Sequence, residues 1–131
     1  MSQEVIDVLS AKGITKFTEV QGSAFKPVLA GRDVIGRSRT GTGKTLAFGI
    51  PSIHRIVELA KQKGTVDRNG RRQRGRGVSM IVLCPTRELA RQVEGELQSI
   101  ARPFNLFTTC FHGGVSYDPQ VRDEDTVKDL N

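Results

Sequence analysis

The sequence predicts an α/β fold, with a doubly wound parallel sheet that carries helices on both faces. Short apolar runs alternate with amphipathic stretches along the chain, which is the order that βαβ units require. In addition, a glycine-rich loop joins the apolar run at 33–36 to a helix-like stretch that begins at Lys44. With 131 residues, of which 37% are apolar, the chain can bury a core but forms at most one domain.

The elements follow from the spacing of apolar residues. Gly13 ends the first helix, the second ends near Gly31, and Pro51 is expected to bend or break the third. The expected helices cover 4–11, 20–29, the stretch after Lys44, and 86–101. The expected strands are 33–36, 78–84 and 106–111. Because strands and helices alternate, the crossovers are predicted to be right-handed.

The positive charge is concentrated in one segment. The net charge is +6, and residues 61–77 hold seven basic residues against one acidic residue, so this segment supplies the whole excess. Its inner part, 64–77, is rich in Gly and Arg and predicts a disordered surface loop. Such a loop can contact nucleic acid unspecifically or be a solvated insertion, and the excess of Arg over Lys favours nucleic acid.

Several classes of protein are excluded by composition. No apolar run reaches 18 residues, so no membrane span is expected, and the N-terminus does not read as a secretory signal. Cys84 and Cys110 lie in apolar runs without CxxC spacing, which predicts buried free thiols in a reducing, intracellular compartment. His54 is expected to pack or lie at the surface rather than bind a metal. Nucleus, cytoplasm and organelle are not distinguished.

The loop itself predicts a phosphate-binding site. Its two glycines let backbone N–H groups turn toward phosphate oxygens, and the following helix points its positive end at them. Lys44 adds a cation for the β- and γ-phosphates, and Thr45 offers a hydroxyl to Mg²⁺. Ser38 stands where the general pattern has Gly, and an accidental strand-to-helix turn is the alternative. The loop comprises Ser38, Arg39, Thr40, Gly41, Thr42, Gly43, Lys44 and Thr45.

Three further segments narrow the class of protein to which the chain could belong: 13–21, 84–92 and 111–114. In this order and at these distances, the four segments together resemble the DEAD-box ATP-dependent RNA helicase family over about residues 5–122. The segment 13–21 resembles the Q motif, the loop resembles motif I, 85–92 resembles motif Ia, and Gly113 and Gly114 resemble the glycine pair that follows it. The resemblance implies the first part of a RecA-like domain.

The resemblance implies that ATP and Mg²⁺ are the cofactors and that Lys44 and Thr45 take part in catalysis. Gln21 would select adenine, because its amide donates and accepts at once as one adenine edge does, and Thr18 matches the family's hydroxyl position. Phe17 and Glu19 stand where the family commonly has proline. By itself, Gln21 could be an ordinary polar residue that opens a helix.

The resemblance also implies an RNA-binding surface. It comprises Pro85, Thr86, Arg87, Gly113 and Gly114, and a helix N-terminus, a hydroxyl and a guanidinium all suit phosphate. Thr86 can equally be a helix N-cap, with Glu88 favoured in the first turn, and both roles can hold at once. The two glycines alone are typical of any tight turn.

The expected organisation is a truncated helicase ATP-binding domain at 1–122 and an acidic tail at 123–131 that does not match the family. Asp123–Asp125 is interpreted as solvated, because no apolar strand leads into it. The family's acidic motif and second RecA-like domain are expected in a full-length protein, and an uncovered sheet edge predicts self-association. The predicted function is the ATP-binding portion of an RNA helicase. A non-catalytic fragment that binds nucleotide and RNA is the alternative, and a small-molecule P-loop kinase is more distant.

Overall fold

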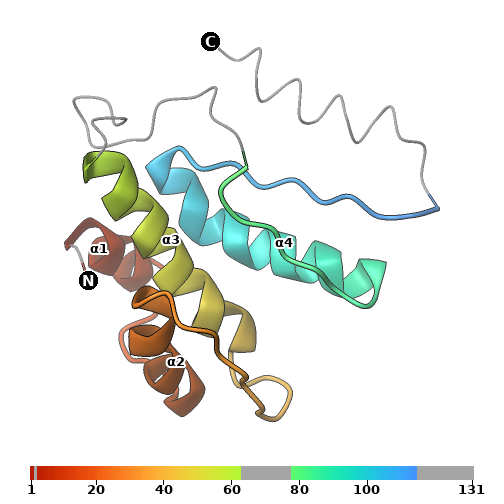
Figure 1. Ribbon diagram of the computed structural model, residues 1–131, viewed down its shortest axis with the longest axis horizontal. Helices are drawn as coiled ribbons and strands as arrows, with labels where there is room; N and C mark the ends of the chain where they lie inside the picture. The colour runs from red at the N-terminus through yellow and green to blue at the C-terminus, as the bar shows by residue number, and fades with distance from the viewer. Residues whose placement is uncertain (2, 63–77, 115–131) are drawn as a thin grey trace. The chain divides into compact units, whose positions relative to one another are not determined.

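The computed structural model describes residues 1, 3–62 and 78–114. In chain order the elements are α1 (Gln3–Ala11), α2 (Glu19–Leu29), α3 (Lys44–Gln62), α4 (Arg87–Ala101) and the 3-10 helix η1 (Arg102–Phe104), as Figure 1 shows. The chain forms two compact units, Met1–Thr65 and Val66–Asn131. The predicted basic loop at 64–77 and the predicted tail at 123–131 lie outside the described residues.

In the first unit, α2 begins at a complete capping box. The Thr18 hydroxyl accepts from the Gln21 backbone N–H, and the Gln21 side chain accepts from the Thr18 backbone N–H. The helix ends at Leu29, and Gly31, which follows the C-cap residue Ala30, has a φ of +74° in the left-handed region. There the N–H groups of Gly31 and Arg32 donate back to the carbonyls of Val28 and Pro27. The predicted ends of α2 are therefore confirmed within one residue.

The longest helix, α3, directly follows the glycine-rich loop and packs against α2 (Figure 1). Pro51 lies inside it, and the helix continues without a break to Gln62, so the expected break is wrong, while the alternative of a bend stays a prediction. Pro51 lacks an N–H to donate to Ala47, but burial of the helix offsets that missing bond because Pro51 and Ile50 are among its fully buried side chains. The buried residues of α3 are Ala47, Gly49, Ile50, Pro51, Ile53, His54, Val57 and Ala60.

In the second unit, α4 is capped at its start by Thr86, whose hydroxyl accepts from the Leu89 N–H at 3.2 Å. Val93, Leu97 and Ile100 are buried at helical spacing, which confirms the predicted apolar face. After η1 the chain turns back at Asn105, whose φ of +57° is one that Asn tolerates better than most residues. After this turn the segment 106–114 leaves the C-terminal end of α4 and runs back along the helix.

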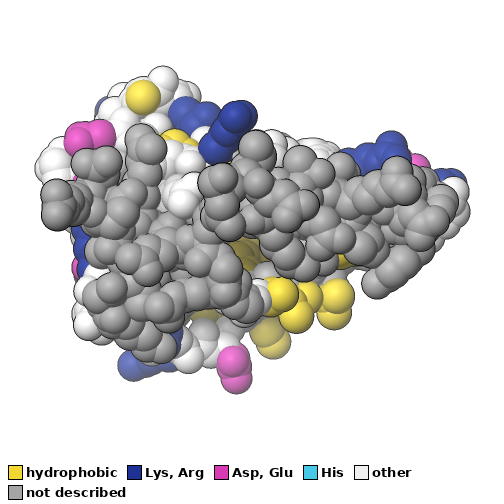
Figure 2. All heavy atoms as spheres, turned by 90° about the horizontal axis from the view of Figure 1, so that it is seen from above, with side chains coloured by type: hydrophobic (Ala, Val, Ile, Leu, Met, Phe, Trp, Pro, Cys, Tyr) yellow, Lys and Arg dark blue, Asp and Glu magenta, His cyan; other side chains and the backbone are white. Residues whose placement is uncertain are grey.

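The predicted sheet is not confirmed. None of the described residues is in a strand, and the three runs expected as strands are irregular. Most of their apolar side chains are exposed instead: Ile35 is fully exposed, and Leu83 is 91% exposed. Figure 2 shows hydrophobic side chains exposed on one face of the molecule. Strands need a partner ladder for their backbone groups, so α/β is supported only in its helical part.

Four further observations concern membrane spans, the two cysteines, His54 and metal binding. No helix among the described residues is long and apolar enough to cross a membrane. Cys84 and Cys110 are free thiols, but they are half-buried rather than buried. His54 is buried and stacks on Phe25 with 6.3 Å between ring centroids, so its predicted packing role is confirmed. The described part of the chain contains no cluster of residues suited to a metal ion.

Candidate functional site

The glycine-rich loop lies between the irregular run that ends at Gly36 and the first turn of α3. Gly41 and Gly43 have φ values of +79° and +82°, which residues with a side chain rarely adopt. At Gly43 space is also limiting, because an added Cβ would lie 2.3 Å from the Gln21 side-chain nitrogen. Both glycines are therefore required by the backbone path, and Gly43 is required by its neighbour as well.

Hydroxyl groups hold the loop closed on itself. The side chains of Ser38 and Thr42 are hydrogen-bonded at 2.8 Å, and the Thr42 hydroxyl lies 2.9 Å from the Arg39 carbonyl, to which it donates. Because the Thr42 proton goes to Arg39, the Ser38 hydroxyl donates to Thr42. Ser38, which departs from the general pattern, thus has a role in this loop that Gly could not fill.

Lys44 is the first residue of α3, and its ammonium turns back over the loop. It donates to the carbonyls of Ser38, at 2.9 Å, and Arg39, at 2.5 Å. These carbonyls are neutral acceptors, whereas phosphate oxygens are charged and form stronger bonds to an ammonium. Arg37 and Arg39 are exposed and no acidic residue lies between 34 and 57, so the neighbourhood favours an anion.

Two residues from the start of α2 join it to this loop. The Thr18 hydroxyl donates to the Thr42 carbonyl at 2.9 Å, and the Gln21 side-chain N–H donates to the Gly43 carbonyl at 3.2 Å. The same two side chains form the capping box of α2, so one set of atoms stabilises the helix start and fixes the loop. We call this set of contacts the Thr18–Gln21 clamp.

The side-chain amide of Gln21 forms two hydrogen bonds in the clamp, but it can form more. Its oxygen accepts from the Thr18 N–H and its nitrogen donates to Gly43, which leaves one N–H and one lone pair. One donor and one acceptor are what adenine recognition requires. The side chain is only 5% exposed, however, so a base would reach it only after a local movement. Adenine selection by Gln21 stays a prediction.

The donors present fit a polyphosphate with its magnesium ion. Gly43 has no side chain where Gln21 approaches, Lys44 has an ammonium over the loop, and Thr45 places a half-buried hydroxyl in the first turn of α3. Thr40 is exposed at the tip of the loop. The predicted phosphate-binding residues are thus contiguous around one loop, and the clamp adds Thr18 and Gln21 to it.

The second predicted surface belongs to the other unit and begins at α4. Pro85 is exposed just before the N-cap residue Thr86, and Arg87 forms an exposed ion pair with Glu88 at 3.3 Å. Thr86 is indeed an N-cap, so its structural role is confirmed. An exposed pair between neighbouring side chains is weak, so the Arg87 guanidinium can exchange its partner at little cost.

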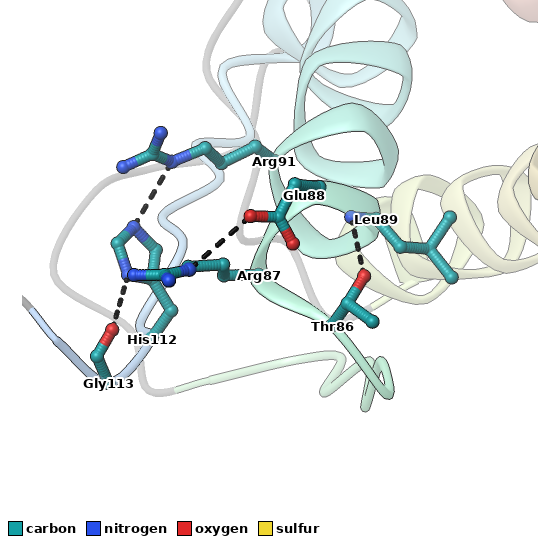
Figure 3. A network of polar contacts seen from close by, with 7 residues as sticks. All are labelled: Thr86, Arg87, Glu88, Leu89, Arg91, His112 and Gly113. Carbon is teal, nitrogen blue, oxygen red and sulfur yellow. Dashed lines mark hydrogen bonds and ion pairs between the residues drawn. The ribbon is translucent and has the colours of Figure 1, made fainter.

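The segment 108–114 returns along α4 and brings the predicted glycines to Arg87. Gly114 has a φ of +81°, and a Cβ there would lie 3.0 Å from an Arg87 terminal nitrogen. Arg91 donates from Nε to His112 at 3.1 Å, and His112 in turn lies 3.2 Å from the Gly113 carbonyl (Figure 3). The structure therefore brings Gly114 beside Arg87 and Gly113 beside His112.

Arg91 and His112 were missed by sequence reasoning. None of the five residues on either side of His112 in the sequence is charged, so nothing in its sequence neighbourhood indicates a partner. Arg91 follows Arg87 by four residues, a spacing that places two side chains on one helix face. That spacing could have indicated Arg91 as a neighbour of Arg87. The contact with His112 could not be predicted, because it depends on the return of the chain after Asn105.

The comparisons with known proteins all indicate one family. A family model described as DEAD/DEAH box helicase matches residues 18–129. DEAD-box ATP-dependent RNA helicase 9, mitochondrial, of Arabidopsis thaliana is 43% identical over 123 residues, which cover 94% of this chain and 18% of that protein. DEAD-box ATP-dependent RNA helicase 3B, chloroplastic, of Zea mays is 45% identical over 120 residues, which cover 92% and 15%. The chain thus spans less than a fifth of each of these relatives.

A solved structure is also similar. The RNA helicase Prp28 from Chaetomium thermophilum, bound to ADP, matches with a TM-score of 0.72 and 29% sequence identity. The match covers 92% of this chain and 27% of that one. The arrangement of helices and loops described above is therefore similar to part of a helicase fold.

Proposed function

We infer that this chain, which belongs to the DEAD/DEAH box helicase family, forms the ATP-binding portion of an ATP-dependent RNA helicase. In the longer protein, ATP binding and hydrolysis would be coupled to RNA remodelling. The observation that carries this proposal is the Thr18–Gln21 clamp. It joins the segment that would recognise adenine to the loop that would bind phosphate, through hydrogen bonds to Thr42 and Gly43.

The clamp supports a nucleotide rather than a phosphate ion as the ligand. A phosphate ion would need only the loop, whereas a nucleoside triphosphate needs a base-recognition group at a fixed place beside it. Gln21 lies there with a free donor and a free acceptor, and Thr18 fixes its orientation through the capping box. The neighbour Prp28 was solved with ADP, which agrees with this assignment.

Each loop residue has a defined task in this proposal. Lys44 would leave the two loop carbonyls to bind the β- and γ-phosphates, and the backbone N–H groups around Gly41 and Gly43 would bind phosphate oxygens. Thr45 would bind Mg²⁺, which neutralises charge on the phosphates when bound. All of these residues would act by placing positive charge or N–H groups around the phosphates, because phosphoryl transfer depends mainly on positioned charges.

RNA would bind the other unit. Pro85, Thr86 and Arg87 would contact its backbone, and Gly113 and Gly114 would allow the sugar-phosphate chain to approach closely. We further propose a second RecA-like domain as a partner in the longer protein. The exposed apolar runs around Ile81 and Leu83 support self-association of the isolated chain. The free thiols support a reducing intracellular compartment.

The test is binding and hydrolysis of ATP by the 131-residue chain and by Lys44→Ala, with and without single-stranded RNA. We expect Lys44→Ala to lose about 10- to 100-fold in affinity for a fluorescent ATP analogue, because charge-assisted bonds to phosphate are lost. Lys26→Ala, which removes an exposed lysine of α2, is the matched control and should bind like the parent.

Equal affinity of Lys44→Ala and the parent would contradict the phosphate role. The hydrolysis assay separates the two functions expected from the sequence. RNA-stimulated turnover that disappears in Lys44→Ala supports an active ATP-hydrolysing unit. ATP binding without turnover, in the presence and absence of RNA, supports a non-catalytic binding fragment.

A further inference from the structure

Three contacts join one face of α4 to the returning segment. From the start of the helix onward, Arg87 lies beside Gly114, Arg91 donates to His112, and Glu94 accepts from the Thr108 hydroxyl. Residues 87, 91 and 94 are spaced at four and three, so they share one helix face. The contacts run in opposite order along the segment, which shows that 108–114 lies antiparallel to the helix.

The hydrogen bonds indicate the tautomer of the His112 ring. The Gly113 carbonyl can only accept, so the proton of the neutral ring is on Nδ1. Nε2 then carries a lone pair and accepts from the Nε–H of Arg91 at 3.1 Å (Figure 3). This partner is neutral, so Arg91 is held in place while its positive charge stays uncompensated.

The acidic residues of α4 are directed to other partners. Glu88 pairs with Arg87, Glu94 with Thr108, and Glu96 with the Gln92 amide. Within the described part of the chain, the terminal nitrogens of Arg91 have no hydrogen bond of their own. An exposed arginine whose Nε is fixed and whose terminal N–H groups remain available is suited to bind an anion.

We propose that Arg91 is an additional contact to an RNA phosphate beside Arg87, and that His112 is the positioning residue that orients it. The inference rests on the proposed RNA-binding role of this unit. Two guanidiniums one helical turn apart would bind phosphates of one strand, and Gly113 and Gly114 would keep the path beside Arg87 open. His112 acts only through Arg91, by supplying the acceptor that fixes Nε.

The test is the affinity of the 131-residue chain for a short fluorescein-labelled oligouridylate, measured by anisotropy across a salt series. Arg91→Ala should weaken binding about 5-fold and reduce the slope of log affinity against log salt by about 0.7, the value of one phosphate contact on a single strand. Arg102→Ala is the matched control, because it removes one exposed arginine just beyond the same helix. It should change affinity less than about 2-fold and leave the slope unchanged.

Two variants of His112 separate positioning of Arg91 from support of the glycine turn. In His112→Gln the terminal amide oxygen can replace Nε2 as the acceptor for Arg91. In His112→Asn the shorter amide can replace Nδ1 as the donor to Gly113 but does not reach Arg91. We expect His112→Gln to bind like the parent and His112→Asn to lose as much as Arg91→Ala. The double variant Arg91→Ala/His112→Asn should lose no more than Arg91→Ala alone.

The outcomes distinguish this inference from the proposed function. If Arg87→Ala weakens RNA binding while Arg91→Ala behaves like Arg102→Ala, the Arg91 contact is wrong and the RNA-binding surface stands. If His112→Asn keeps the affinity that Arg91→Ala loses, the positioning role is wrong. If the parent chain does not bind the RNA, or Arg87→Ala has no effect, both the inference and the RNA-binding surface are overturned.

Discussion

The two candidate sites begin in the same way and then diverge at one position. Each starts at a threonine N-cap, Thr18 for α2 and Thr86 for α4. Three residues later stands Gln21 in α2 and Leu89 in α4. Gln21 is 5% exposed and bonds to Thr18 and Gly43, whereas Leu89 is 38% exposed and provides only its backbone N–H.

This difference decides how far each cap acts. The Thr18 cap reaches the loop 24 residues away, because its hydroxyl and the Gln21 amide both bond to loop carbonyls. The Thr86 cap stays within its own first turn, and the surface around it is built from exposed side chains such as Arg87 and Arg91. A buried, backbone-directed site is rigid and sensitive to shape, while an exposed, charged site is adaptable and sensitive to salt.

The largest expected effect on ATP affinity comes from filling the space between Gly43 and the Gln21 side chain. Gly43→Ala forces a side chain into a left-handed conformation and within 2.3 Å of the Gln21 nitrogen. The strain is on the order of 1–3 kcal/mol before the clash is added, so we expect the affinity for a fluorescent ATP analogue to fall at least about 10-fold.

Two glycine variants calibrate that result. Gly41→Ala has the same left-handed strain, but nothing lies within 4 Å of its added Cβ, so its loss should be smaller. Gly22→Ala lies within α2 with open space around it and should stabilise the fold by about 0.5–1 kcal/mol. If Gly43→Ala and Gly41→Ala lose equal affinity, the contact with Gln21 does not limit the loop.

The second effect separates the two caps directly. Thr18→Ala loses the cap and the bond to Thr42, so we expect about 2 kcal/mol less free energy of unfolding and weaker ATP binding. Thr86→Ala loses only a local cap, so about 1 kcal/mol and unchanged ATP binding are expected. Denaturant titration and nucleotide binding measure both quantities. Weakened ATP binding in Thr86→Ala would show that its cap is not local. Thr18→Ser, which keeps the hydroxyl, should restore most of the loss.

The third effect is smaller and depends on pH. Burial lowers the pKa of His54 below its ordinary value of 6.5, and its Nδ1 has no hydrogen bond among the described residues. Because the unfolded chain then takes up the proton more readily than the folded chain, stability falls as the pH drops through 6.5 and below. His54→Leu cannot titrate, so its melting temperature should decline less than that of the parent between neutral and mildly acid pH. Parallel declines would mean that His54 is not the cause.

The helices and the position of the glycine-rich loop could be predicted from the sequence because their signals are local. Apolar spacing, capping residues and terminal glycines act within a few residues, and they placed α1, α2 and α4 nearly to their ends. A helix break was wrongly expected at Pro51. The missing backbone hydrogen bond is a local effect, whereas the burial of α3 that offsets it comes from residues distant in sequence.

Long-range pairings could not be predicted. The Thr18–Gln21 clamp depends on bonds over 22 and 24 residues, and the contact of Arg91 with His112 spans 21 residues. The sheet requires strand pairing that no local pattern contains, and the runs expected to form it are exposed. The family motifs therefore indicate candidate residues, whose roles stay predictions, whereas tertiary contacts decide how these residues are held.

The smallest effect lies away from both sites and tests whether α1 contributes to the unit that holds the glycine-rich loop. Lys61, near the end of α3, binds Glu4 of α1 and also lies 3.5 Å from Glu58. These contacts, the Glu4 hydrogen bond first, raise the pKa of Lys61, so their contribution is complete at neutral pH and is lost only above the ordinary lysine value. Exposed ion pairs contribute on the order of 0.2–1 kcal/mol, so Lys61→Met should lower the free energy of unfolding by about 0.5 kcal/mol.

The loss of stability should shrink in high salt, and Lys16→Met, which removes an exposed loop lysine, should show no loss. If ATP affinity also falls in Lys61→Met, the docking of α1 is coupled to the loop at the other end of α3, and the clamp is not the only long-range support of the nucleotide site.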